Sequence, residues 1–388
     1  MNIKSLLFGS AAALVAVSGA RAADAVVAAE PEPAEYVKIC DVYGAGYFYI
    51  PGTETCLRIG GYIRYDMGVG DSGTFDGVNH VPDHMDAGED HSTYYKNTRF
   101  TLKTWTGQET DLGTLKTYTE TRFQFGNSSG DYDVQTPANN GWQAANKSVT
   151  LNFAWIQLGG VRVGKDETAY DTFIGYAGNV VQDTIIPYGI RDTNLISYYF
   201  DAGSGFTGVV SLEEGTGANT IDSYIPHVVG GLKYKADWGA VTGVVAYDSN
   251  YEEVTGKVRL DVNVTKELSL FVMGGYGTDD NLTDPSNAIN AHGRSQYKPW
   301  GGNWAVWGGG TYKFNDRTSF NVQASADDDK NIALAANVAY TIVPGFTVTT
   351  EVDWDHYGNF GNGSLYGNWT KANKKDGIGG IVRFQRSF

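Results

Sequence analysis

Hydrophobic and polar residues alternate along most of the chain with a period of two. In the segment 57–67, for example, Leu57, Ile59 and Ile63 share one face, whereas Arg58 and Arg64 share the other. Successive side chains of a β-strand point to opposite faces, so this pattern predicts strands with one apolar and one polar face. The segments 113–125, 254–262, 332–342 and 346–354 repeat the pattern, and no helical spacing of similar length occurs. The sequence therefore predicts an all-β chain.

The alternating segments divide into sixteen predicted strands. An even number is usual for single-chain barrels of bacterial outer membranes. The short fifth strand is the least defined, and fourteen or eighteen strands stay open as alternatives. The predicted strands begin at Leu57, Tyr95, Gly113, Val149, Val161, Asn194, Phe206, Val228, Gly239, Val254, Leu268, Asn303, Thr318, Asn331, Phe346 and Gly377.

The connections between these strands alternate between short and long. Long polar connections occupy 68–93, 126–147, 164–193, 214–226, 278–300 and 356–375, and the turns between them contain only a few residues. Outer-membrane barrels have short periplasmic turns at one end and long extracellular loops at the other. This order predicts a transmembrane antiparallel β-barrel. A soluble β-sandwich, whose polar face meets bulk water, is the alternative that alternation alone leaves open.

The polar face of the predicted strands carries many charges, which bears on what fills the barrel. A sheet that crosses lipid must close, because every backbone polar group needs a partner within the protein. Charged side chains facing inward would be costly in a dry core without partners, whereas a sixteen-stranded barrel is wide enough for water. An apolar exterior and a charged interior together predict an aqueous pore.

The first residues have the pattern of an export signal. Lys4 precedes an apolar run over 6–17, and Ala20 and Ala22 occupy the small-residue positions of a cleavage site. The predicted organisation is a signal peptide over 1–22, an N-terminal periplasmic segment over 23–56 and a barrel over 57–388. Cys40 and Cys56 are the only cysteines, and an exported chain permits a disulfide between them. A free thiol pair or a metal site is the less favoured alternative.

Composition excludes several other classes of protein. The 388 residues carry a net charge of −15, which argues against a nucleic-acid partner. Beyond residue 20 no run of 18 apolar residues occurs, so no membrane-spanning helix is predicted. Hydrolase, zinc-protease, phosphate-binding and thiol redox motifs are all absent. His80, His84 and His91 share one polar loop, and a solvated loop is favoured over a metal site. We therefore expect no enzyme activity, cofactor or metal.

Five segments of the chain carry a family likeness, namely CDVYGAGYFYIPGTETCLRIGGYIRYD over 40–66, FAWIQLGGVRVG over 153–164, DWGAVTGVVAYD over 237–248, PGFTVT over 344–349 and GGIVRFQRSF over 379–388. They resemble the general porins of alphaproteobacteria of the rhizobial and Brucella type. The likeness covers nearly the whole chain after the signal segment. It implies a homotrimer of sixteen-stranded barrels in the outer membrane, passive diffusion of small hydrophilic solutes, and a third long loop folded into each lumen. The terminal Phe388 resembles the signal by which the outer-membrane assembly machinery recognises such barrels.

The third long connection, 164–193, is the predicted constriction. It combines acidic residues with an apolar side that would pack inward, and the preceding strands carry basic residues on their polar face. An acidic loop opposite a basic wall would place a transverse field across the channel. The alternative is that the basic residues form ordinary salt-bridge ladders in a wide lumen. The predicted basic wall is Arg58, Arg64, Arg99, Lys103 and Arg122, and the predicted acidic loop residues are Asp166, Glu167, Asp171 and Asp183.

These features favour a general diffusion porin, and they allow a solute-specific outer-membrane channel as the alternative. The second function would need an ordered track of aromatic or arginine side chains through the lumen. An outer-membrane enzyme is less consistent with the sequence, because the histidines lie in scattered loops. The expected partners are two further copies of the chain, outer-membrane lipid and lipopolysaccharide, the assembly machinery and small hydrophilic solutes. We further expect that neutralising Asp166 and Asp171 shifts permeability toward anions.

Overall fold

The computed structural model describes residues 38–72, 78, 81–86, 88–127, 143–189, 191–278, 295–358 and 375–388. The chain divides into two compact units, Met1–Ile39 and Cys40–Phe388, and the second unit holds all the strands. The predicted signal segment, 1–22, lies outside the described residues. Sixteen long strands are β2 (Cys56–Gly70), β5 (Tyr95–Thr110), β6 (Gly113–Gly126), β8 (Thr150–Leu158), β9 (Val161–Glu167), β10 (Asp192–Gly203), β11 (Phe206–Glu213), β12 (His227–Ala236), β13 (Gly239–Asp248), β14 (Glu253–Asn263), β15 (Leu268–Gly277), β16 (Trp304–Asn315), β17 (Thr318–Asp327), β18 (Ile332–Val343), β19 (Phe346–His356) and β20 (Asp376–Ser387).

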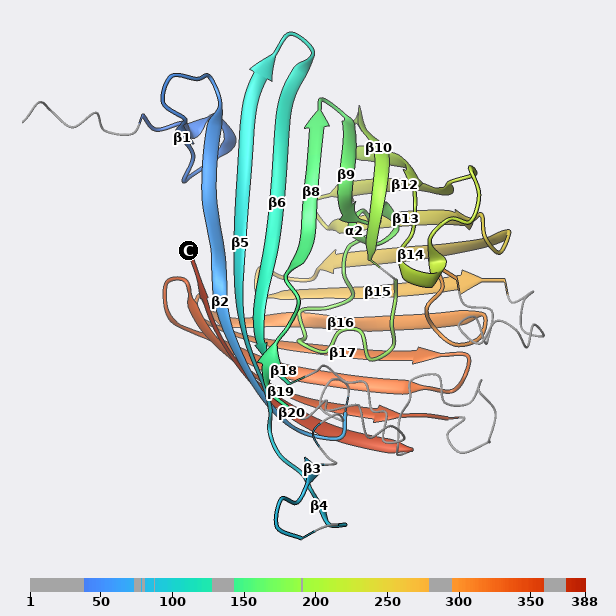
Figure 1. Cartoon of the computed structure of the whole chain (residues 1–388). Helices are drawn as coiled ribbons and strands as arrows, with labels where there is room; N and C mark the ends of the chain where they lie inside the picture. The colour runs from blue at the N-terminus through green and yellow to red at the C-terminus, as the bar shows by residue number, and fades with distance from the viewer. Residues whose placement is uncertain are drawn as a thin grey trace, which may run out of the picture. The chain divides into compact units, whose positions relative to one another are not determined.

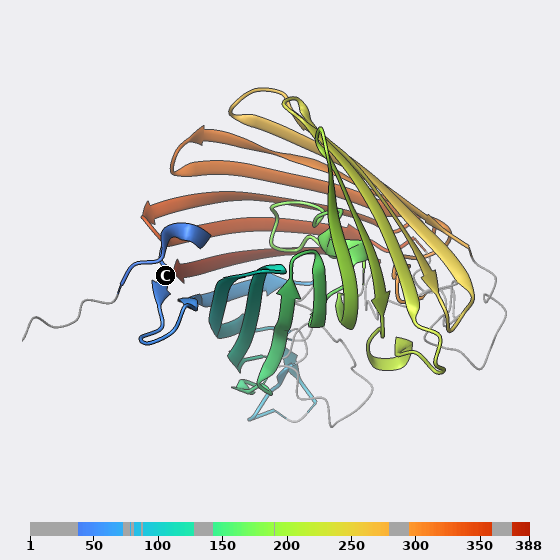
Figure 2. The same cartoon turned by 90° about the horizontal axis from the view of Figure 1, so that it is seen from above.

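These strands form one closed antiparallel sheet. Each long strand pairs with the next one along the chain, and β2 pairs with β20 from Tyr62↔Ser387 to Gly70↔Gly379. Figure 1 shows the strands in this order, and Figure 2 shows the sheet curving around an interior segment. Every strand begins within two residues of its predicted start. The predicted sixteen-stranded barrel is confirmed, and the short strand at Val161 is one of its members.

The outward face of the sheet is apolar. On β2, Ile59, Ile63, Met67 and Val69 are exposed, whereas Asp66 between them is buried on the inward face. The same alternation of exposed apolar and buried side chains continues along β13, β14 and β18. An exterior on which the exposed residues are the apolar ones suits a hydrocarbon surrounding.

Shorter elements lie outside the barrel wall or within its connections. They are η1 (Asp41–Tyr43), β1 (Phe48–Tyr49), the hairpin of β3 (Val81–Pro82) and β4 (Asp90–His91), β7 (Ala145–Asn146), α2 (Ala169–Thr172) and η3 (Gly217–Asn219). The first two belong to an arm over 40–55 that returns to β2, where Phe48 pairs with Leu57. The predicted disulfide between Cys40 and Cys56 is present and closes this arm. Among the described residues, no helix has the length and apolar character needed to cross a membrane.

The interior contains an apolar core, of which the inward-packing side of the third long connection was predicted and the contribution of segment 295–302 was not. Part of the connection after β9 and the segment 295–302 pack against inward-facing side chains of β11 to β18. The alternation pattern had indicated a charged, aqueous interior all round. The difference arises because two connections enter the barrel and cover one side of its wall. The buried core comprises Ala169, Tyr170, Ile174, Ala177, Ile186, Tyr188, Val209, Val229, Val244, Ala246, Met273, Tyr297, Trp300, Ala305, Trp307 and Ala333.

Candidate pore constriction

The connection from β9 to β10 covers residues 168–191 and is called the lumen loop here. It begins with α2, whose N-cap residue Thr168 accepts a hydrogen bond from the Tyr170 backbone N–H at 3.1 Å. The loop was predicted over 164–193. Because β9 extends to Glu167 and β10 starts at Asp192, the observed connection is shorter. Asp166 and Glu167 therefore belong to β9 rather than to the loop.

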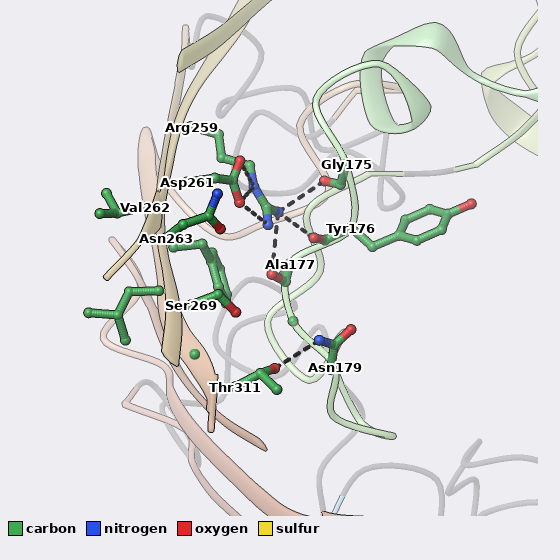
Figure 3. A pocket seen from close by; sticks show the side chains of 14 residues that line it. Gly175, Tyr176, Ala177, Asn179, Arg259, Asp261, Val262, Asn263, Ser269 and Thr311 are labelled. Atoms are coloured by element: carbon green, nitrogen blue, oxygen red, sulfur yellow. Dashed lines mark hydrogen bonds and ion pairs between the residues drawn. The ribbon is translucent and has the colours of Figure 1, made fainter. Parts of the chain in front are cut away.

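Arg259 of β14 holds the first part of the lumen loop by its backbone. Its Nη1 donates to the carbonyl oxygens of Tyr176, Ala177 (3.3 Å) and Gly175 (3.5 Å), as Figure 3 shows. Asp261 accepts two hydrogen bonds from Arg259 Nε at 2.9 Å and fixes the guanidinium in place. A planar guanidinium with five donors suits this simultaneous contact with several oxygens.

Further anchors come from the next strands around the barrel. The Glu351 carboxylate of β19 accepts the backbone N–H groups of Val181 (2.5 Å) and Gln182 (2.7 Å). Trp307 Nε1 of β16 donates to the Ile186 carbonyl oxygen at 2.8 Å, and Gln323 Nε2 of β17 donates to the Asp183 carbonyl oxygen at 2.9 Å. These contacts place the loop against the inward face of β14 to β19, inside the ring of strands (Figure 2).

A buried ion pair fastens the start of the lumen loop to β14. Lys257 Nζ lies 2.6 Å from Asp171 Oδ1 and donates to the Tyr188 carbonyl oxygen at 2.8 Å, and both charged side chains have 0% exposure. A Cβ atom at Gly189 would lie 1.8 Å from Asp171 Oδ2, so only glycine leaves room for the carboxylate. Asp171 therefore contacts lysine and backbone in this structure instead of facing the channel.

The opposite side of the interior carries partly exposed charged side chains and is called the open wall, although Val181 of the lumen loop packs against a cluster of Val78, Tyr95 and Ile381 there. The open wall consists of β2, β5, β6, β8 and β20. Charged side chains here keep part of their surface in contact with solvent: 26% for Lys103, 25% for Arg122, 20% for Arg383 and 14% for Arg64. Lys257, behind the start of the lumen loop, has 0% exposure by contrast, although Arg259 and Asp261 farther along β14 keep 11% and 38%.

Two acidic side chains organise the basic residues of the open wall. Asp66 accepts Arg383 Nε at 2.7 Å and lies 3.2 Å from Arg64 Nε. Glu120 lies 3.1 Å from Lys103 Nζ and 2.6 Å from Arg122 Nη2. Each carboxylate thus has two cationic neighbours, so each group keeps one unit of positive charge.

Arg99 adds a further positive charge to the open wall. It lies directly opposite Arg64 on the neighbouring strand, and its Nε donates to Gln124 Oε1 at 2.8 Å. Like charges opposite each other in a sheet lower its stability. The Arg64–Arg99 pair therefore gives the open wall a surplus of positive charge that the packing of the sheet does not require.

The lumen loop presents fewer charges toward this wall. Asp183 accepts a hydrogen bond from the Tyr188 hydroxyl at 2.5 Å and lies 3.4 Å from Arg191 Nη2. Burial raises the pKa of the Asp183 carboxyl, although Arg191 and the Tyr188 hydroxyl oppose that rise. Glu167, at the end of β9, accepts a hydrogen bond from the Tyr176 hydroxyl. Asp183 and Arg191 of the lumen loop, with Glu167 of the adjoining β9, form what is called the free edge of the loop, which therefore combines two carboxylates with one guanidinium.

The structure brings together six of the nine predicted constriction residues, and Asp166 of β9, which pairs with Arg162, is the first of three exceptions. Arg64, Arg99, Lys103 and Arg122 share the open wall, and Asp183 belongs to the loop. Arg58 lies instead beside Trp105, with its guanidinium carbon 4.7 Å from a ring centroid, close to the short turn between β5 and β6. Asp171 is the buried anchor described above.

Other residues of the site were not in the predicted set. Arg383 is one of these residues, and its contact with Asp66 joins residues 317 apart in sequence. Arg191, which lies beside Asp183, is another. Lys257 and Glu351 anchor the loop across 86 and 170 residues respectively. The period-two pattern predicts which face of a strand each residue occupies. It does not predict contacts between residues far apart in sequence, because these form only when the barrel closes.

In the described part of the histidine-rich loop, a side-chain contact accounts for one of the three histidines. His91 of β4 bonds to the Asp83 carboxylate, and that bond, with two backbone N–H groups, lowers the pKa of Asp83 to about 2. His80 lies outside the described residues. Within the described part of the chain, no group of three or more His, Cys, Asp or Glu side chains could hold a metal ion.

Comparison with known proteins decides the family. A model of the porin subfamily matches residues 24–381. The chain is 48% identical over 398 aligned residues to the porin Omp2b of Brucella suis, Brucella abortus and Brucella melitensis, with 100% of both chains covered. The chain belongs to the porin subfamily. It is a general diffusion porin of the outer membrane, and this membership makes it a channel rather than an enzyme.

Solved structures share the fold of this porin. The outer-membrane channel DcaP of Acinetobacter baumannii has a TM-score of 0.56 at 14% identity and covers 88% of this chain and 99% of its own. An anion-selective porin from Comamonas acidovorans has a TM-score of 0.50 at 15% identity, over 86% and 100%. At such identities the likeness shows the barrel fold alone.

Proposed function

We propose that solutes cross this porin between the open wall and the free edge of the lumen loop. The observation that carries the proposal is the contrast in exposure between the two sides of the interior. Charged side chains of the open wall keep part of their surface in solvent, whereas Lys257 and Asp171 behind the loop have none. This contrast supports a water-filled passage along β2, β5, β6, β8 and β20.

The charges along this passage would set its ion selectivity. The open wall has three positive charges in excess, from the Asp66 group, the Glu120 group and Arg99. The loop edge has Glu167 and Asp183 with a single arginine. A positive wall facing a weakly negative edge creates a transverse field. We assign Arg64, Arg99, Lys103, Arg122 and Arg383 to the wall of the constriction, and Glu167 and Asp183 to its loop side.

We also propose that the porin works as an exported homotrimer. Residues 1–22 would be removed on export, residues 23–56 would lie in the periplasm, and the apolar exterior would contact outer-membrane lipid, lipopolysaccharide and neighbouring copies. Phe388 would present the terminal aromatic side chain to the assembly machinery. In support, its side chain is 56% exposed, and its backbone exchanges hydrogen bonds with Gly61 of β2 at 3.0 and 3.1 Å.

Single-channel recording of the refolded mature chain in a planar bilayer tests this proposal. Conductance steps that appear in groups of three, with current proportional to voltage, are the expected result. A barrel that migrates as folded protein on a gel but passes no current would overturn the open passage. Conductance in single, independent steps would overturn the trimer while leaving the passage intact.

A further inference from the structure

Three aromatic side chains form a continuous row across the open wall. Trp105 of β5 lies directly opposite Tyr118 of β6, and Tyr118 lies directly opposite Trp155 of β8. The ring centroids are 5.3 Å apart in the first pair and 5.7 Å apart in the second. All three side chains are only partly buried, so this aromatic row borders the water-filled part of the interior.

The aromatic row has an arginine at each end. Arg58 lies opposite Trp105 with its guanidinium carbon 4.7 Å from the ring centroid, and Arg162 lies 4.1 Å from the Trp155 centroid. Arg162 is held by Gln157 Oε1 at 2.8 and 3.0 Å and by Asp166 Oδ2 at 2.7 Å. A fixed guanidinium over a ring restrains both groups, which makes the row a rigid surface.

The row also has a defined place along the proposed passage. Lys103 and Glu120 are cross-strand partners two residues away from Trp105 and Tyr118 on the same inward face, toward the long-loop end. Two residues of a strand span about 7 Å, so a solute would meet the charged groups and the aromatic row within one sugar length. The Tyr118 hydroxyl links the aromatic row to these charged groups by donating a hydrogen bond to Glu120 Oε2 at 2.8 Å.

This combination matches the chemistry of a pyranose ring. A pyranose has apolar C–H faces and a rim of hydroxyl groups that both donate and accept hydrogen bonds. The row supplies aromatic surface, while Arg162, Gln157 and Lys103 supply charged and amide partners beside it. Sites for small ligands commonly combine an apolar lining with a few fixed polar groups.

We propose that the aromatic row is a weak binding site for pyranose sugars on their way through the pore. The proposal rests on the passage proposed above and adds a preferred class of solute to it. Binding in a channel must be weak enough to allow release, and a row that is open to water on one side meets this condition. Sugars would therefore enter the narrow region from a site where they are already oriented.

The test is the effect of maltotriose on the current of the reconstituted porin in potassium chloride. We expect the current to fall with maltotriose concentration and to saturate. The W105A/W155A variant should need a concentration about fivefold higher or more for half of the effect, since each lost stacking contact is worth a factor of a few. The W105F/W155F variant keeps an aromatic ring at both positions and should recover most of the response.

Two controls make the outcome specific. Sorbitol has similar hydroxyl groups but no ring, so it should lower the current only through viscosity. Phe123, which stacks on Phe100 at 5.8 Å on the outward face, offers an aromatic loss outside the lumen, so F123A should respond to maltotriose as the wild type does.

Each remaining outcome has a clear meaning. Normal potassium chloride conductance with no saturating maltotriose effect would overturn the sugar site and leave the passage standing. An equal effect in the wild type and in W105A/W155A would overturn it too. If the double variant does not fold, W155A alone must show a weaker response. Absence of any conductance in the folded wild type would instead contradict the passage.

Discussion

At the scale of single residues, partners decide what each charge does. Lys257 and Arg99 are both inward-facing cations, yet Lys257 is sealed against Asp171, whereas Arg99 faces the passage and donates to the uncharged Gln124 side chain. The period-two pattern predicted the face of both residues. It could not distinguish them, because Asp171 lies 86 residues from Lys257 and meets it only after the lumen loop has folded inward.

The buried ion pair predicts a large effect of removing one partner. K257M leaves the Asp171 carboxylate buried without its counter-charge, and such a change costs about 3–5 kcal/mol of folding free energy. We expect the variant to lose its folded gel migration at a lower temperature than the wild type. The double variant K257M/D171L removes both charges and should recover most of the loss. Equal unfolding temperatures for K257M and the wild type would contradict the assignment of this pair as an anchor.

This arrangement changes the expected effect of neutralising Asp166 and Asp171. Asp166 is paired with Arg162 at 2.7 Å, and Asp171 lies out of contact with solvent. Asp171 is therefore a poor choice for altering selectivity, because its removal would first disturb the loop. Charges that are partly exposed and lack an opposite charge are the better test.

At the scale of elements, the strands were predictable and the connections were not. Alternating residues gave all sixteen strands, including the short β9. The polar segment 278–300 looked like an external loop, yet Tyr297 and Trp300 at its end are buried against the lumen loop and β16. Tyr297 and Trp300 stand among polar residues and show no period-two alternation. The sequence pattern therefore could not predict that this segment turns into the barrel.

The tip of the lumen loop is predicted to depend on Glu351. E351Q keeps the shape of the side chain but removes the charge that accepts two backbone N–H groups, and hydrogen bonds to a charged group contribute about 1.5–3 kcal/mol each. We expect more open-channel current noise, because the loop tip is less firmly held. The exposed Glu267 of a short turn provides the control, and E267Q should leave the noise unchanged. Equal noise in both variants would contradict the anchoring role.

The N-terminal arm is predicted to contribute to stability without affecting permeation. Replacing both cysteines, C40S/C56S, opens a loop with a sequence separation of 16 residues. In the chain-entropy account, a loop of that size contributes about 3 kcal/mol. We expect a lower unfolding temperature and an unchanged single-channel conductance. A changed conductance would contradict this prediction, because it would show that the arm reaches the passage.

At the scale of the whole molecule, the interior is divided into a packed half and an open half. The lumen loop and segment 295–302 fill the side formed by β11 to β18 with an apolar core. Arg64, Arg99, Lys103, Arg122 and Arg383 remain on the other side, where the first and last strands of the barrel meet. Sequence patterns predicted that the barrel would be hollow, but the division depends on contacts between distant segments.

The measurement that tests this account most directly is the reversal potential across a potassium chloride gradient for the wild type, R99Q and K266Q. R99Q removes an open-wall charge without leaving a carboxylate unpaired, and K266Q removes the same charge from an exposed short turn. If ions pass along the open wall, R99Q shifts the reversal potential toward cation selectivity and K266Q leaves it unchanged. Equal reversal potentials for R99Q and the wild type, with both barrels folded, would contradict the passage along the open wall.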